Sequence, residues 1–324
     1  MLIDVLLLLL GLVLLVGGGD ALVRGASAMA YRLGVSPLVV GLTVVAFWTS
    51  APELAVNLAG TLSGRGELSF GNVMGSNIAN VGLVVGATAL LRPLVLHRAV
   101  IVREIPMMSL AALAALVMSL DRFLEDTPAG TVDRFSRGDG LVFLLFFGVF
   151  LYYTINDALR QRSEMRAPEK ALARMSMLRA VLLFVFGLAA LVAGGQVTVD
   201  AASSIALAMG MSEAVVGLTV VAIGTSLPEL VTSLVGALRG EQEIAVGNIV
   251  GSNIFNLLFV LGTTSTVNPV PVPAGGLPDV LMVIALSLIL LPLSFNPERS
   301  IPRKGGALLL ASYAAYLLWR ILSG

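Results

Sequence analysis

The sequence contains no cysteine and a single histidine, His97, and these two shortages exclude several classes of protein. Without cysteine there are no disulfides, no thiolate-bound metals and no thiol chemistry. One histidine, placed beside Arg98, supplies neither a His-rich metal site nor a Ser-His-Asp triad. Charged residues are also scarce, at 12% of the chain, and the formal net charge is zero. Nothing in this balance indicates a nucleic-acid partner.

Apolar residues take the place of the missing charge. They make up 57% of the 324 residues, and the mean hydropathy is +0.95. An ordinary soluble domain is about one quarter charged, so this chain has too little polar surface to be one. Stretches of about 20 apolar residues, enough to cross a bilayer, recur along it. We predict an all-α membrane protein with ten transmembrane helices, at 2–32, 37–62, 68–91, 98–120, 138–160, 173–209, 213–238, 245–267, 277–295 and 304–322.

The basic residues predict the orientation of these helices. Ten spans would place 15 of the 20 Lys and Arg residues on one side of the membrane and five on the other. Basic residues concentrate in cytoplasmic loops. We therefore expect a multi-pass protein of the cell (inner or plasma) membrane with both termini outside.

Two stretches of the chain occur twice. GLTVVAFWTSAPELAVNLAG begins at Gly41 and returns at Gly217 as GLTVVAIGTSLPELVTSLVG. GNVMGSNIAN begins at Gly71 and returns at Gly247 as GNIVGSNIFN. Both pairs are 176 residues apart, so no insertion separates the paired stretches. The chain is therefore predicted to consist of two related halves.

Helix parity gives the two halves opposite directions. Five helices in each half is an odd number, so the second half enters the membrane from the opposite side. Two inverted five-helix repeats related by a pseudo-two-fold axis in the membrane plane are a common plan for secondary transporters. We predict a first repeat over residues 1–160, a cytoplasmic connection over 161–172 and an inverted repeat over 173–324.

Each repeated stretch carries a proline inside an apolar helix. Pro52 has no N–H and leaves the carbonyl of Trp48 without its helical partner, and Pro228 does the same near Gly224. Broken backbone at membrane depth persists only where other groups satisfy it. A bound cation would do so.

Polar side chains recur at four-residue spacing in the same stretches, so each row lies along one face of a helix. All of them offer oxygen, which suits Ca²⁺, Na⁺ or Mg²⁺ rather than Zn²⁺ or Cu²⁺. A proline kink or an interhelical hydrogen bond explains most of these residues singly, but an intramembrane carboxylate is a functional-site hypothesis by default. The four rows are Thr49, Glu53 and Asn57; Thr225, Glu229 and Ser233; Asn72, Ser76 and Asn80; and Asn248, Ser252 and Asn256.

At these residues the chain resembles the calcium/cation antiporter superfamily, which includes the Na⁺/Ca²⁺ exchangers. The two repeats of that superfamily carry G-T-S-x-P-E and G-N-x-x-G-S-N. Here they read FWTSAPE with GNVMGSN, and IGTSLPE with GNIVGSN. The resemblance covers essentially the whole chain and, without a large insert between the halves, is to the compact prokaryotic type. It implies an antiporter of Ca²⁺ and Na⁺ that is not an enzyme and needs no cofactor.

The resemblance also implies a role for individual residues. The carboxylates of Glu53 and Glu229 would be the central ligands shared by Ca²⁺ and Na⁺. The neutral ligands would be backbone carbonyls of Thr49, Thr225, Ala46 and Ala222, hydroxyls of Ser50, Ser226, Ser76 and Ser252, and the amides of Asn80 and Asn256.

Two positions depart from the family pattern. Trp48 stands where the motif has glycine, whereas its counterpart in the second repeat is Gly224. The indole would narrow access, alter helix sliding or face lipid. Asn256 occupies a position that is aspartate in K⁺-dependent relatives, and the loss of that carboxylate argues against K⁺ co-transport.

Several functions are compatible with these residues. The first is alternating access, in which Ca²⁺ and Na⁺ compete for the site around Glu53 and Glu229 while the first and sixth helices slide. A H⁺/Ca²⁺ exchanger with one protonated glutamate is the nearest alternative. An intramembrane hydrolase using the glutamates as acid and base lacks a nucleophile–base pair, and the inverted repeat favours a transporter over a passive channel.

One charged pair lies outside the repeated motifs. Asp20 and Arg24 are four residues apart on the first helix, and Asp200 occupies the position of Arg24 in the second repeat. We predict either a local or a cross-half ion pair near the cytoplasmic end that helps to gate access; a surface pair at the headgroup level is the alternative.

Overall fold

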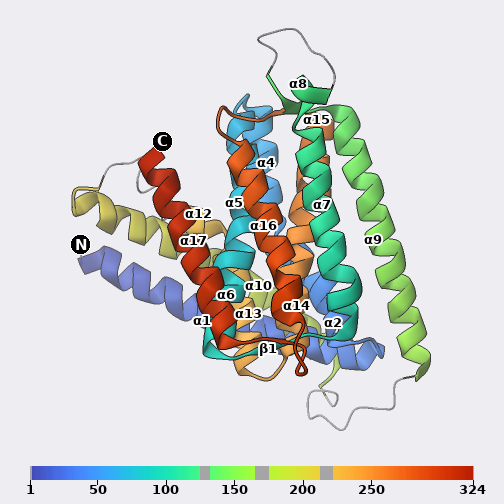
Figure 1. Ribbon diagram of the computed structural model, residues 1–324. Helices are drawn as coiled ribbons and strands as arrows, with labels where there is room; N and C mark the ends of the chain where they lie inside the picture. The colour runs from blue at the N-terminus through green and yellow to red at the C-terminus, as the bar shows by residue number, and fades with distance from the viewer. Residues whose placement is uncertain (1, 125–131, 165–174, 212–221, 324) are drawn as a thin grey trace.

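The computed structural model describes residues 2–124, 132–164, 175–211 and 222–323, which are predominantly helical (Figure 1). Several helices contain a π-helical turn, marked η. The helices are α1 (Leu2–Leu33), α2 (Pro37–Val40), η1 (Gly41–Val45), α3 (Ala46–Thr49), α4 (Ala51–Leu62), α5 (Gly66–Ala79), η2 (Asn80–Val85), α6 (Gly86–Leu91), η3 (Val100–Glu104), α7 (Ile105–Met118), α8 (Asp121–Leu124), α9 (Arg137–Glu164), α10 (Met177–Ala208), α12 (Ala222–Thr225), α13 (Leu227–Leu238), α14 (Gln242–Ile254), η6 (Phe255–Val260), α15 (Leu261–Val267), α16 (Leu277–Ser294) and α17 (Arg303–Ser323).

Nine of the predicted membrane helices correspond to apolar helices in the described residues. Eight are long and apolar enough to cross a membrane, and the pair Pro37–Thr49 and Ala51–Leu62, bent by 40°, makes a ninth. The predicted helix at 213–238 begins among residues outside the described ranges, and its described part contains the shorter apolar helix α13. The predicted connection at 161–172 also falls largely outside them, although α9 continues to Glu164. A helical multi-pass membrane fold is confirmed, and the count of ten stays a prediction.

Helices α1 and α10 are 32 residues long and unbroken. They lie side by side and run obliquely to the upright helices α4, α5, α7, α9 and α16 (Figure 1). Glycines bring the two backbones into contact: a Cβ on Gly18 would lie 2.8 Å from the carbonyl oxygen of Gly187, and one on Gly194 would lie 2.9 Å from that of Gly11. Gly187 and Gly194 follow Gly11 and Gly18 by 176 residues. The same contact is therefore made twice, once from each helix.

The apolar core divides into two clusters. The main cluster packs α5, α7, α9, α14 and α16 together and, in the part of the chain that the structure describes, contains no residue of α1 or α10. The second cluster joins α1 and α10 to a few neighbours, including Val40, Val45 and Ile244. The α1–α10 pair thus has an apolar cluster of its own, which reaches the rest of the bundle through these neighbours.

Two short pairs of strands, which the sequence did not predict, connect loops of the two halves. Strand β1 (Leu94–Val95) pairs antiparallel with β4 (Ser300–Ile301), and β2 (Arg134–Phe135) pairs antiparallel with β3 (Val270–Pro271). The β1 strand lies at one end of the bundle and α8 at the opposite end (Figure 1). These pairs fix the loops between helices without changing the helical character of the fold.

Candidate functional site

Both repeated prolines break their helices in the same way. Ser50 separates α3 from α4 with φ −88° and ψ 3°, and Ser226 separates α12 from α13 with φ −88° and ψ 4°. Pro52 and Pro228 follow within the first turn of α4 and α13, where a missing N–H does no harm to the new helix. The break places each glutamate in the first turn of a helix, at its positive end.

The two glutamates lie in the interior of the bundle. Glu53 and Glu229 are each only 1% exposed, and they are close enough to interact electrostatically. Burying two carboxylates without compensating charge or hydrogen bonds is strongly unfavourable. The chain therefore needs positive charge at this point to keep both glutamates ionised.

Hydrogen bonds connect the first half to the second at the glutamates. The Ser50 hydroxyl donates to Glu229 Oε1 at 3.3 Å. The Thr49 hydroxyl lies 3.0 Å from Asn248 Oδ1, to which it donates, and 3.4 Å from Ser252 Oγ. Asn248 in turn donates to Ser233 Oγ at 3.1 Å. Residues from the broken helices α3–α4 and α13 and from α14 thus meet at one place.

Both glutamates and several of the residues predicted to bind ions carry buried polar atoms that have no hydrogen-bond partner among the described residues. They include Oε2 of both glutamates, and such a concentration of buried, unsatisfied oxygens calls for a bound ion or water. No three His, Cys, Asp or Glu side chains gather within the described ranges, so most ligands of an ion here would be neutral oxygens. Further unpartnered atoms on the polar rows and at the second helix break are Oγ of Ser76 and Ser226, Oδ1 of Asn57, and the side-chain oxygen and nitrogen of Asn80 and Asn256.

The residues predicted to bind ions through their backbone carbonyls differ in their surroundings between the two repeats. The Ala46 carbonyl already accepts hydrogen bonds from Ser50 N at 3.0 Å and from Thr49 Oγ1 at 3.3 Å. Ala222 and Thr225 begin and end α12, directly after residues 212–221, which lie outside the described ranges. Thr225 therefore lies next to the break at Ser226, as Thr49 lies next to the break at Ser50.

Two features of the site were missed by the sequence analysis. Asn248 was placed on a polar row without a role, yet it joins Thr49 to Ser233 and the Glu229 carbonyl. Asn80 and Asn256 lie in π-helical turns, which often occur at functional sites. No pattern of residues in the sequence predicts a π-helical turn. The four-residue spacing of Asn248 from Ser252, in contrast, was a signal that could have identified Asn248.

Position 48 and its counterpart differ in their surroundings. Trp48 is 45% exposed and lines an apolar groove of about 310 Å³ with Phe47, Phe147, Phe255 and Phe259 among others. Gly224, in contrast, lies against α10, where a Cβ would approach Val199 Cγ2 to 2.1 Å. The indole is therefore partly exposed beside this groove, and the three expectations for it stay predictions.

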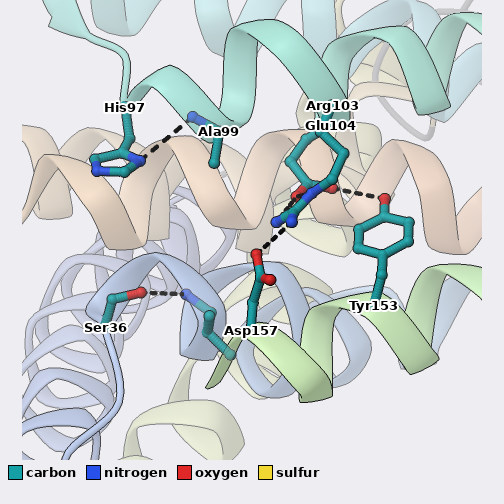
Figure 2. Close-up of polar contacts among 8 residues, drawn as sticks. Ser36, His97, Ala99, Arg103, Glu104, Tyr153 and Asp157 are labelled. Atoms are coloured by element: carbon teal, nitrogen blue, oxygen red, sulfur yellow. Dashed lines mark hydrogen bonds and ion pairs between the residues drawn. The ribbon is translucent and has the colours of Figure 1, made fainter. Parts of the chain in front are cut away.

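A second polar cluster lies away from this site and joins η3 to α9. Arg103 donates to Glu104 Oε1 at 2.8 Å and pairs with Asp157, while Tyr153 donates to Glu104 Oε2 at 2.8 Å (Figure 2). Asp279, 176 residues after Arg103, pairs with Arg320 at 2.9 Å and accepts a hydrogen bond from Tyr316. Each carboxylate in these clusters is already paired, so both clusters fix neighbouring helices instead of offering a cation site.

The predicted ion pair at Asp20 is present in both local and cross-half form. Asp20 lies 3.6 Å from Arg24 and also pairs with Arg239, which follows α13 in the second half. Asp200 accepts a hydrogen bond from Gln196 at 2.9 Å. The cross-half partner of Asp20 is therefore Arg239, a residue that the sequence analysis did not name.

Comparisons with known proteins agree with this geometry. The family model described as sodium/calcium exchanger protein matches residues 3–156 and again residues 179–322. The chain is 38% identical over 327 residues to the putative antiporter CaxA of Alkalimonas amylolytica, with 98% of each chain covered. It is 35% identical over 345 residues to the sodium/calcium exchanger MaX1 of Methanosarcina acetivorans, again with 98% of each covered. A solved structure of the sodium-calcium exchanger NCX_Mj matches with a TM-score of 0.82 at 31% identity over 98% of both chains.

Proposed function

This chain belongs to the sodium/calcium exchanger family and is a cation antiporter, and from that premise we propose that it exchanges Na⁺ for Ca²⁺ by alternating access. The observation that carries the proposal is the buried pair Glu53 and Glu229, joined across the halves by Ser50. Two carboxylates balance one Ca²⁺ or part of the charge of several Na⁺. Competition between these ions for the same oxygens would couple their movements.

The ligands of this site follow from the buried oxygens. Glu53 and Glu229 supply the charge, and the hydroxyls of Ser76 and Ser226 and the amides of Asn80 and Asn256 offer buried oxygens that have no hydrogen-bond partner among the described residues. Ca²⁺ takes 6–8 oxygen ligands in a forgiving geometry. Ser50, Ser252 and the carbonyls of Thr49, Thr225, Ala46 and Ala222 complete the proposed set.

The architecture proposed with this function is two inverted five-helix halves. The glycine contacts between α1 and α10, the matching breaks at Ser50 and Ser226, and the double match of one family model support it. The halves would be 1–160 and 173–324, joined by a cytoplasmic connection at 161–172. The proposed location is the cell membrane with both termini outside, as the distribution of basic residues favours.

The test is Ca²⁺ uptake by vesicles that contain the purified protein. An outward Na⁺ gradient should drive uptake, and a pH gradient alone should not. Glu53→Gln and Glu229→Gln should each abolish uptake, because a neutral amide cannot balance the ion's charge. Glu67→Gln, an exposed glutamate at the start of α5, is the matched control and should transport normally. Uptake driven by pH and indifferent to Na⁺ would assign the chain to H⁺/Ca²⁺ exchange instead.

A further inference from the structure

Helices α1 and α10 contact the two halves unequally. Gly19 of α1 lies against α13, where a Cβ would come within 2.9 Å of Val231 Cγ1. The corresponding positions, Gly195 of α10 and Ala55 of α4, follow the same 176-residue offset. No described atom lies within 4 Å of a Cβ on Gly195, and α10 makes little contact with α4. Helix α1 is therefore packed closely against α13 of the second half, whereas α10 is not packed in the same way against α4 of the first half.

The same inequality holds at the broken helices. Val199 of α10 lies so close to Gly224 of α12 that even a Cβ there would approach it to 2.1 Å. The counterparts of these residues are Val23 of α1 and Trp48 of α3. Val23 is fully buried in the cluster that α1 forms with α10, and α1 makes little contact with α3. The contact that α10 makes with α12 has no equivalent in the first half.

Position 48 decides whether that equivalent contact can form. If the two halves exchanged roles, α1 would lie against α3 as α10 now lies against α12. Val23 would then need the space beside residue 48 that a glycine leaves open beside Val199. Trp48 puts the largest side chain of all at this position, and its indole is one wall of the aromatic groove formed with α9 and η6.

We propose that Trp48 is a positioning residue that holds the protein in the access state seen here, by obstructing the place that α1 would take against α3 in the opposite state. The proposal rests on the alternating-access exchange proposed above, in which one part of the bundle moves against the other around a fixed site. The ion ligands are nearly the same in both halves, so the bias towards one state lies in this residue beside the site.

The close approach at Gly224 makes the proposal specific about which substitution matters. Trp48→Gly removes the obstruction and gives both halves a glycine at this position. Trp48→Ala keeps a Cβ, and a Cβ alone already overlaps at the equivalent position. The opposite state should therefore gain population in the glycine variant and much less in the alanine variant, although the two differ by one methyl group.

The chain has no cysteine, so introduced pairs report the two states by disulfide formation. Gly19→Cys with Val231→Cys reports the state seen here, and Ala55→Cys with Gly195→Cys reports the opposite state. The purified full-length protein in lipid vesicles is oxidised with copper phenanthroline, and unreacted thiols are counted with a maleimide. In Trp48→Gly the second pair should cross-link about tenfold faster and the first pair more slowly.

Trp319→Ala is the matched control, because Trp319 is 46% exposed on α17 and lies outside the groove. It should leave both cross-linking rates as in the parent protein. Unchanged rates in Trp48→Gly, or equal acceleration in Trp48→Ala and Trp319→Ala, would overturn the proposal. These readouts need no transport. Cross-linking that does not respond to Trp48→Gly while Na⁺-driven Ca²⁺ uptake persists therefore rejects the role of Trp48 alone, and absent uptake with responsive cross-linking rejects the proposed exchange.

Discussion

Ser50 Oγ donates a hydrogen bond to Glu229 Oε1 at 3.3 Å, so a residue of the first half fixes the carboxylate of the second. Ser50 occupies the break between α3 and α4, where its backbone belongs to neither helix. The backbone conformation at the break therefore sets the direction of the Ser50 hydroxyl. This hydrogen bond therefore links the two halves beside the buried carboxylates of Glu53 and Glu229.

Ser50→Ala should weaken Ca²⁺ binding because Glu229 loses this donor. Hydrogen bonds to charged groups contribute about 1.5–3 kcal/mol, so the Kd for Ca²⁺ should rise by about tenfold or more, measured by calorimetric titration of the purified protein. Ser63→Ala is the control, since exposed Ser63 donates only to the Ala59 carbonyl. Equal affinities in the two variants would contradict the role of Ser50.

Neighbouring glycines on α1 should respond in opposite ways to alanine. A Cβ on Gly18 would meet the backbone of Gly187 and Leu191 at 2.8 Å, so Gly18→Ala must force α1 and α10 apart and lower the midpoint of thermal unfolding. Gly17 is exposed with no described atom within 4 Å of its Cβ. Gly17→Ala should stabilise the helix by up to about 1 kcal/mol. A common effect of both substitutions would mean that backbone contact does not hold the pair together.

The ion pair of Asp20 with Arg239 should contribute more to stability than the pair with Arg24. Both are partly exposed, so each is expected to contribute roughly 0.2–1 kcal/mol, with the contact within α1 at the lower end. Double-mutant cycles with Asp20→Asn, Arg239→Gln and Arg24→Gln, read as free energies of unfolding in detergent, separate the two pairs. A larger coupling energy for Arg24 would show that α1 does not rest on the end of α13 in solution.

Removing the Arg103 guanidinium should destabilise the contact between η3 and α9. Glu104 has a fully buried side chain whose two oxygens are held by Arg103 and Tyr153 (Figure 2). Breaking such a pair costs about 3–5 kcal/mol when fully buried, and Arg103 is partly exposed, so we expect the lower part of that range for Arg103→Met. The double variant Arg103→Met/Glu104→Met should recover most of the loss. Failure to recover would mean that the cation's contact with the Tyr153 ring contributes the larger share.

Most of the fold was readable from the sequence because a membrane helix needs a continuous apolar run, and because the repeat marks equivalent positions. The four-residue spacing also identified the polar rows around Glu53 and Glu229. Arg239 could not be identified as the partner of Asp20, since that pair exists only because α1 leans on α13. The π-turns at Asn80 and Asn256 were hidden for a different reason: they arise from a shift in backbone hydrogen bonding that many side chains tolerate.

The glycine seam between α1 and α10 has a mechanical consequence. Where two backbones touch, no side chain lies between them that could change rotamer and let one helix move without the other. We therefore expect the pair to move as one rigid unit, with an apolar cluster of its own. This pair lies against α13 through α1 and makes little contact with α4. If the protein works by the proposed alternating access, this stiffness would keep the site from opening to both sides at once.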